Sequence, residues 1–213
     1  YDFYVFDSAG NLLNFSQNVQ DGNDDAYERF DLTETGSGYR LAVVRYAGEP
    51  RYFEVTAYGG RFKASADGLP AWATPGVTRG HSAAVDAFSV AAAPANLPRS
   101  TLLEPGDPAN PRGPFPEVFT AAQLPERFTS DGPRRIFFAA DGTPAPQLRQ
   151  KPEITAADGV VTSLAAPFAR FFGTSASAPH AAAIAGLVLS GNPTATESEL
   201  REAFEATALD LAP

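Results

Sequence analysis

The chain contains no cysteine, no methionine, and only two histidines and two lysines among its 213 residues. Without cysteine it can form neither a disulfide nor a metal–thiolate site, although this absence says little about the compartment in which the protein works. No apolar run is long enough to cross a bilayer as a helix, and no secretion signal can be recognised. His81 and His180 are the only residues in this chain that could serve as a histidine base.

Positive charge is also scarce, because 25 acidic residues outnumber 16 basic ones and leave a formal net charge of −9. Apart from the Arg134-Arg135 pair, the arginines are scattered singly. Binding to nucleic acid needs clustered lysine and arginine, so we expect no nucleic-acid partner. The oxygen-rich run at residues 21–25 leaves two interpretations open, a calcium loop or a polar turn. The polar turn is favoured because the full spacing of a calcium motif is missing.

The first part of the chain has the pattern of short β-strands. Tyr, Phe and Val are concentrated in five segments that are separated by turn residues, for example at residues 7–11. The five segments are 1–6, 12–15, 27–32, 39–46 and 51–58. Such closely spaced strands predict a small all-β sandwich over residues 1–62, joined near Gly59-Gly60 to a second domain over residues 63–213.

Residues 172–183 place a serine at the start of a helix made of small residues. Gly173 allows the backbone to approach a substrate closely, and Thr174 is a suitable N-cap. Ser175 then lies on the first turn, where its N–H group is free to face an oxyanion. A serine hydroxyl needs a base and such an electrostatic cradle to become a nucleophile. Pro179 should loosen this turn without ending the helix.

Two helices are expected in this region. From residue 181 to residue 190 the side chains are small or apolar on every side, which is typical of a helix that is buried all round. This helix should end at Gly191-Asn192-Pro193. A second helix follows, with Thr196 as its N-cap, acidic residues in its first turn and apolar residues at helical spacing.

The segment 172–183 resembles the nucleophile segment of the subtilases, the subtilisin-like serine peptidases, in which Gly-Thr-Ser precedes Pro-His and a helix of Ala, Val and Gly. Three upstream segments are similar to the family patterns VGA, FSSxGP and KPDIxAPG: residues 87–92, 128–133 and 151–160. The last departs from its pattern at Glu153 and at Ala157-Asp158, which replaces Pro-Gly. The resemblance covers the C-terminal half of a subtilase catalytic domain. Residues 1–62 are similar to β-sandwich modules of secreted bacterial peptidases.

The resemblance implies an α/β fold, in which a partial subtilisin-like parallel sheet with packed helices follows the small all-β sandwich. It implies a serine endopeptidase that hydrolyses protein or peptide substrates through an acyl-enzyme on Ser175 and requires no cofactor. A structural calcium ion in the intact protein stays open. Secretion or a cell-surface location is implied in the same way. His180 is expected to be structural, because it lies five residues beyond Ser175 on the same helix and points in another direction.

The rest of the subtilase machinery has no clear match. The family needs Asp, His and Ser in that order, together with an asparagine in the oxyanion hole. His81 lacks the His-Gly-Thr context and Asp7 lies in a hairpin turn, so a triad of these two with Ser175 is disfavoured. Asn11 and Asn14 are expected to be turn and strand residues. We therefore expect the Asp, His and Asn to lie upstream, in a missing N-terminal half of the catalytic domain, and this chain alone to be inactive.

Other functions can be set against this one. A pseudopeptidase that has lost its base would be non-catalytic and would act as a binding module through the β-sandwich. An α/β-hydrolase esterase is excluded, since Ser177 stands where its nucleophile elbow needs glycine and no histidine follows Asp210. Half of a parallel sheet would also leave unpaired edges and an uncovered apolar face. We expect self-association through these edges, or coverage by the chain's own loops.

Overall fold

The computed structural model describes residues 1–21, 27–33, 36–57, 62, 76–101, 103, 108–139 and 141–211. The chain divides into two compact units, Tyr1–Ala57 and Tyr58–Pro213. The join that we expected at Gly59-Gly60 lies outside the described residues, as does the oxygen-rich run after Asp21. The domain limits at residues 62 and 63, and the calcium loop, therefore stay predictions.

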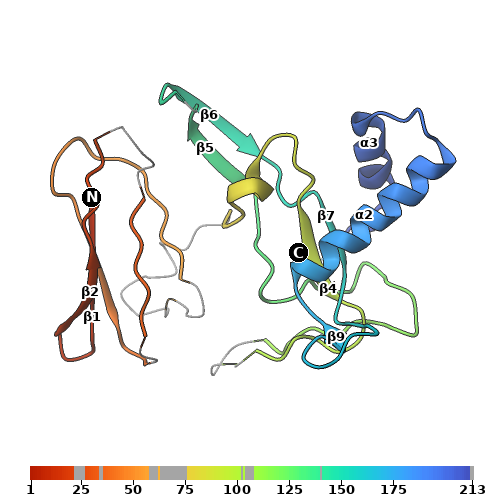
Figure 1. Cartoon of the computed structure of the whole chain (residues 1–213), viewed down its shortest axis with the longest axis horizontal. Helices are drawn as coiled ribbons and strands as arrows, with labels where there is room; N and C mark the ends of the chain where they lie inside the picture. Colours follow the sequence, from red (N-terminus) through yellow and green to blue (C-terminus); the bar gives the residue numbers. More distant parts are fainter. Residues whose placement is uncertain are drawn as a thin grey trace. The chain divides into compact units, whose positions relative to one another are not determined.

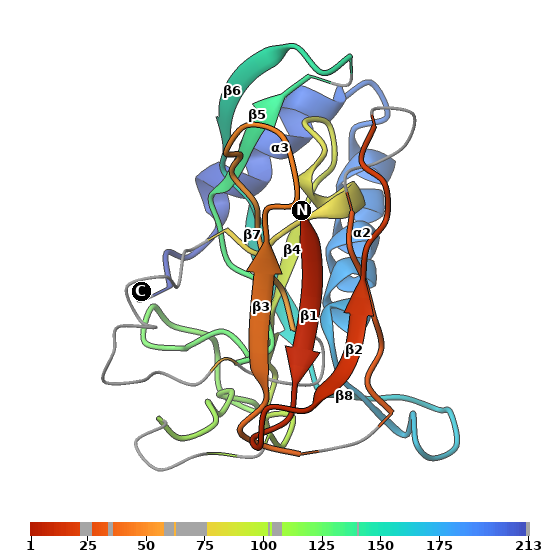
Figure 2. The same cartoon turned by 90° about the vertical axis from the view of Figure 1, so that its left-hand side faces the viewer.

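The N-terminal unit is built on a three-stranded antiparallel sheet. β1 (Asp2–Phe6) lies between β2 (Leu12–Ser16) and β3 (Arg40–Val44), as Figure 2 shows. The turn between β1 and β2 is held by the carboxylate of Asp7, which accepts the backbone N–H groups of Ala9 and Asn11 at 2.9 and 2.8 Å. This hairpin was predicted from its turn residues and is confirmed.

The expected strands at 27–32 and 51–58 join no ladder within the residues that the structure describes. The described parts of both segments nevertheless pack on the sheet through aromatic rings. Phe3 lies 5.2 Å from Phe30 between ring centroids, and Tyr1 lies 5.4 Å from Phe53. As far as the structure describes it, the N-terminal unit therefore has the predicted β character, with one laddered sheet and two segments packed beside it.

In the C-terminal unit, a small parallel sheet carries the helix that begins at the candidate serine. β4 (Val90–Pro94) and β7 (Ile154–Asp158) pair in register, and α2 (Thr174–Gly191) packs against both strands (Figure 1). Small side chains on β4 and α2 are almost fully buried: Ala92, Ala93, Ala176, Ser177 and Ala181. The prediction of an α/β fold with a parallel sheet and a packed helix is confirmed.

The remaining elements connect this layer. A 3₁₀ turn, η1 (Gly80–Ala83), precedes β4. An antiparallel hairpin of β5 (Arg134–Phe138) and β6 (Pro144–Arg149) precedes β7. The short pair of β8 (Val160–Val161) and β9 (Arg170–Phe171) lies between the end of β7 and the start of α2. This pair therefore connects the end of β7 to the start of α2.

α3 (Glu197–Thr207) begins with the predicted cap. The hydroxyl of Thr196 accepts the N–H of Glu199 at 3.3 Å, and the carboxylate of Glu199 accepts the N–H of Thr196 at 2.8 Å, which together form a capping box. The helix is attached to the start of β7 by Arg201, which pairs with Glu153 at 2.8 Å. Within the part of the chain that the structure describes, neither helix has the length and apolar character needed to cross a membrane.

The expectation that α2 is buried all round is wrong. Its buried residues are Ala176, Ser177 and Ala181, whereas further along the helix Ile184, Leu187 and Val188 are 50%, 71% and 42% exposed. The reason is that a sheet of two strands covers only one side of the helix. The sequence pattern correctly predicted an apolar helix, but it does not determine how many strands cover that helix. Self-association of the exposed face stays a prediction.

One edge of the small sheet is covered by the chain itself. On the side of β4 away from β7, the carbonyl of Ala92 accepts the N–H of Glu126 at 2.7 Å. The N–H of Ala92 donates to the hydroxyl of Thr129 at 3.0 Å. Residues 126–129 therefore satisfy this strand edge without forming a strand, which is one of the ways in which proteins protect such edges.

Candidate active site

The turn that starts α2 positions the candidate nucleophile. Gly173 is the N-cap, with φ of +110°, a conformation that only glycine adopts without strain. Its carbonyl accepts the N–H groups of Ala176 and Ser177 at 2.8 and 3.2 Å. Thr174 is the first helical residue, so the expectation that it is the N-cap is wrong by one position. The chain enters the helix through the positive φ of glycine, and no side chain caps it.

Ser175 lies on the first turn of α2, and its side chain is exposed. The first N–H groups of a helix have no intrahelical partner, and the helix dipole places positive charge there. A negative oxygen formed next to Ser175 would therefore be stabilised by the helix end. Among the residues that the structure describes, none forms a hydrogen bond with the Ser175 hydroxyl. The site thus provides access and an electrostatic cradle, while no base from the described part of the chain is bonded to the hydroxyl.

The two histidines are held elsewhere. His180 lies on α2 and is half-buried, and its Nδ1 is buried without a hydrogen-bond partner among the described residues. It lines an apolar hollow of about 310 Å³ together with side chains of α2, β8 and β9. His81 lies in η1 and is exposed. The carboxylate of Asp7 is occupied by its own turn. A structural role for His180 and the disfavoured triad therefore stay predictions.

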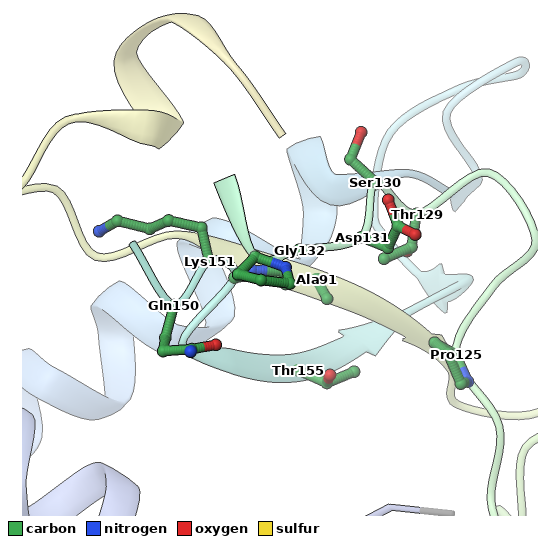
Figure 3. Close-up of a pocket in the computed structure, with 11 residues that line it drawn as sticks. Ala91, Pro125, Thr129, Ser130, Asp131, Gly132, Gln150, Lys151 and Thr155 are labelled. Atoms are coloured by element: carbon green, nitrogen blue, oxygen red, sulfur yellow. The ribbon is translucent and has the colours of Figure 1, made fainter. Parts of the chain in front are cut away.

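A second hollow, of about 350 Å³, lies over the β4–β7 sheet (Figure 3). Its charged lining groups already have partners. The Asp131 carboxylate accepts the N–H groups of Gly76 and Val77, and the Lys151 ammonium donates to the Ala87 carbonyl and to Glu153. Figure 3 shows the Lys151 side chain extended away from Ser130 and Asp131. Both charged groups are thus tied to the protein's own atoms rather than left without a partner.

A pair of buried carboxyl groups lies behind the serine turn and was not singled out from the sequence. Glu126 is 2% exposed, and Asp158, the last residue of β7, is 0% exposed. Burial raises the pKa of both groups above the ordinary values, and the negative charge of Asp158 raises the pKa of Glu126 further. The only signal in the sequence was Ala157-Asp158, which stands where the subtilase pattern has Pro-Gly.

Among the described residues, no group of three acidic, His or Cys side chains could hold a metal ion.

This pair should give the stability of the C-terminal unit a pH dependence. Because the folded state holds the Glu126 proton more tightly than the unfolded state, the free energy of unfolding should fall as the pH rises from about 4.5 through the raised pKa. Glu126→Gln removes this proton, so the variant should gain stability relative to the unmodified protein across that window. Urea unfolding at a series of pH values measures the difference.

Glu199→Gln is the matched control. The Thr196 cap lowers the pKa of Glu199, so its contribution to stability is present above pH 4.5 and is lost as the pH falls through the lowered pKa. The two Glu→Gln variants should therefore depart from the unmodified protein in opposite directions. Equal behaviour of the two variants would contradict the assignment of the raised pKa to Glu126.

An exposed serine at the positive end of a helix that packs on a parallel sheet is an arrangement suited to acyl transfer. The subtilase family model, peptidase S8, matches residues 81–213. The chain therefore belongs to the subtilase family, which relates it to serine peptidases and suggests peptide substrates. Neither the search of curated proteins nor the search of solved structures gave a match.

Proposed function

We propose that this chain is the nucleophile-bearing part of a subtilisin-like serine endopeptidase. The observation that carries the proposal is the exposed Ser175 on the first turn of α2, within the segment that the subtilase model matches. The Ser175 oxygen attacks the carbonyl carbon of a peptide bond, and a base takes its proton. The C–N bond breaks, the amine leaves with that proton, and water then hydrolyses the acyl-enzyme ester. No cofactor enters this reaction, and secretion remains a proposal.

The base and the asparagine of the oxyanion hole are proposed to come from outside these 213 residues. The support is that, in the described part of the chain, neither histidine forms a hydrogen bond with Ser175, and that neither has the sequence context of a subtilase base. The alternative is a non-catalytic pseudopeptidase that binds other proteins through its N-terminal unit. The two proposals differ in one measurable property, which is turnover in the longer natural polypeptide.

The chain alone should show no turnover of a peptide substrate above that of its Ser175→Ala variant. Loss of the histidine base costs on the order of 10⁶ in kcat, a magnitude that belongs to subtilisin itself, the type member of this family. The assay compares residues 1–213 with the longest natural polypeptide that contains them. Activity in the longer polypeptide alone supports the endopeptidase. Inactivity of both supports the pseudopeptidase, and Ser175-dependent turnover by the chain alone would show that the base lies within it.

A further inference from the structure

The buried carboxyl pair is bonded to the backbone of β4 and of the residues that follow it. The N–H of Glu126 donates to Ala92 of β4 at 2.7 Å, and its Oε1 accepts the N–H of Arg99 at 2.8 Å. The carbonyl of Asp158 accepts the N–H of Ala95 at 2.9 Å. The bond to Arg99 holds the Glu126 side chain itself, while the other two bonds fix the main chains of Glu126 and Asp158 beside β4.

Asp158 also reaches the serine turn directly. Its Oδ2 accepts the N–H of Gly173 at 2.8 Å, and Gly173 is the N-cap two residues before Ser175. A Cβ at Gly173 would meet nothing closer than the N of Ser175, at 3.7 Å, so packing around the α-carbon does not fix this residue. Among the described residues, the Asp158 carboxylate is therefore the side chain that accepts the Gly173 N–H and ties this turn to the end of β7.

A proton between the two side chains accounts for two oxygens that have no other partner among the described residues. Glu126 Oε2 and Asp158 Oδ1 are both buried, and neither receives an N–H or O–H from any other described residue. Two buried carboxylates would repel each other, and each would retain an unsatisfied oxygen. One proton shared between the two groups satisfies both oxygens and leaves a single negative charge on the pair.

We propose that Glu126 and Asp158 form a one-proton carboxyl pair that positions the Gly173 turn, and through it the Ser175 nucleophile. Asp158 is the positioning residue and Glu126 holds it in place. The inference rests on the proposed function only where it predicts an effect on acylation. The position of the turn itself can be measured whether or not the protein is a peptidase.

The charge state of the pair follows from its surroundings. The Arg99 guanidinium attracts the negative charge of both carboxyl groups, and Arg170 donates to the carbonyl of Gly159, next to Asp158, at 3.0 Å. The first turn of α2 contains no acidic residue. These groups favour one negative charge on the pair. At higher pH the pair would lose its remaining proton. The buried site would then hold two negative charges, and their repulsion would loosen the bond to Gly173.

The test replaces Asp158 in two ways. Asp158→Ala removes the acceptor of the Gly173 N–H, whereas Asp158→Asn keeps an oxygen for Gly173 and supplies an N–H to Glu126 without any shared proton. The first readout is the protection of the Gly173 amide against hydrogen exchange, measured by NMR on the whole chain. We expect Asp158→Ala to lower this protection by about tenfold or more and Asp158→Asn to restore most of it. Asp210→Ala, an exposed site beyond α3, is the control and should leave it unchanged.

The second readout is kinetic and uses the longest natural polypeptide. A misplaced nucleophile lowers kcat by about 10²-fold, so Asp158→Ala should lower kcat to this extent with KM nearly constant, and Asp158→Asn should recover it.

If Asp158→Ala fails to fold, the Glu126→Gln variant tests the positioning role instead. In the unmodified protein, Gly173 protection should decrease as the pH rises through the raised pKa of the pair, and in Glu126→Gln this decrease should be absent.

The outcomes separate this inference from the proposed function. If no variant has peptidase activity but Gly173 protection responds as stated, the positioning role holds and the endopeptidase proposal fails. If the unmodified protein is active and Asp158→Ala changes neither Gly173 protection nor kcat, the positioning role is overturned. The positioning role is also overturned if Asp158→Asn lowers Gly173 protection and kcat as much as Asp158→Ala does. It is overturned as well if Gly173 protection in Glu126→Gln keeps the pH dependence seen in the unmodified protein.

Discussion

Replacing Ser175 with alanine should lower kcat for peptide hydrolysis by about 10⁶ in the longest natural polypeptide that contains this chain, a magnitude taken from subtilisin, a member of the same family. The acyl-enzyme forms on the Ser175 oxygen, so the variant loses the covalent route while the helix end and the binding surface remain. KM should therefore change much less than kcat. Initial rates with a chromogenic peptide measure both constants.

Ser177→Ala is the matched control, because this serine lies on the same turn but is 0% exposed. Its hydroxyl contacts only the Gly173 carbonyl at 3.5 Å among the described residues, so it cannot reach a substrate. The variant should keep kcat within about tenfold, since a weak neutral hydrogen bond contributes on the order of 1 kcal/mol. If Ser177→Ala were as inactive as Ser175→Ala, the assignment of the nucleophile would not stand.

Gly132→Ala should destabilise the C-terminal unit by about 3 kcal/mol or more. An added Cβ would lie 1.5 Å from the carbonyl oxygen of Lys151 and 2.7 Å from its carbonyl carbon. Both atoms belong to the backbone that leads into β7, and the Lys151 side chain is tied to the Ala87 carbonyl and to Glu153. The clash can be relieved only by moving backbone, either that of Lys151 or that of the turn at Gly132. The free energy of unfolding in urea, followed by circular dichroism, measures the loss.

The same substitution at Gly186 should act in the opposite direction. Gly186 lies inside α2, and a Cβ there would meet no atom within 4 Å. Alanine is favoured over glycine in a helix interior by about 1 kcal/mol, so Gly186→Ala should stabilise the unit slightly. The pair of variants separates a steric effect from a general effect of losing glycine. Equal stability of Gly132→Ala and the unmodified protein would show that the close approach to Lys151 is absent.

Local features of this fold could be predicted because their causes lie within a few residues of each other. Thr196 and Glu199 contain all the atoms of the capping box, so the start of α3 follows from four consecutive positions. The turn at Asp7 is equally local, since the side chain bonds the backbone two and four residues on. The motif that includes Ser175 also identified the start of α2 to within one residue. In each case no distant segment was needed to decide the structure.

The features that could not be predicted depend on distant parts of the chain. The exposure of Leu187 is set by the number of strands beneath α2, which the helix sequence does not encode. The pairing of Glu126 with Asp158 joins residues 32 positions apart, and neither has a pattern that marks it as a site. The only signal was Asp158, which departs from the family pattern at a buried strand end. Such departures are worth examining as structural substitutions with partners elsewhere.

Labelling with a serine-directed phosphonate, which forms a stable ester with an activated serine, tests the central claim most directly. The longest natural polypeptide is treated with the reagent and digested, and the modified residue is located by mass spectrometry. The account predicts one adduct, on Ser175, which is lost in Ser175→Ala and kept in Ser177→Ala. An active polypeptide that is inhibited through an adduct on another serine, with Ser175 unmodified, would contradict it.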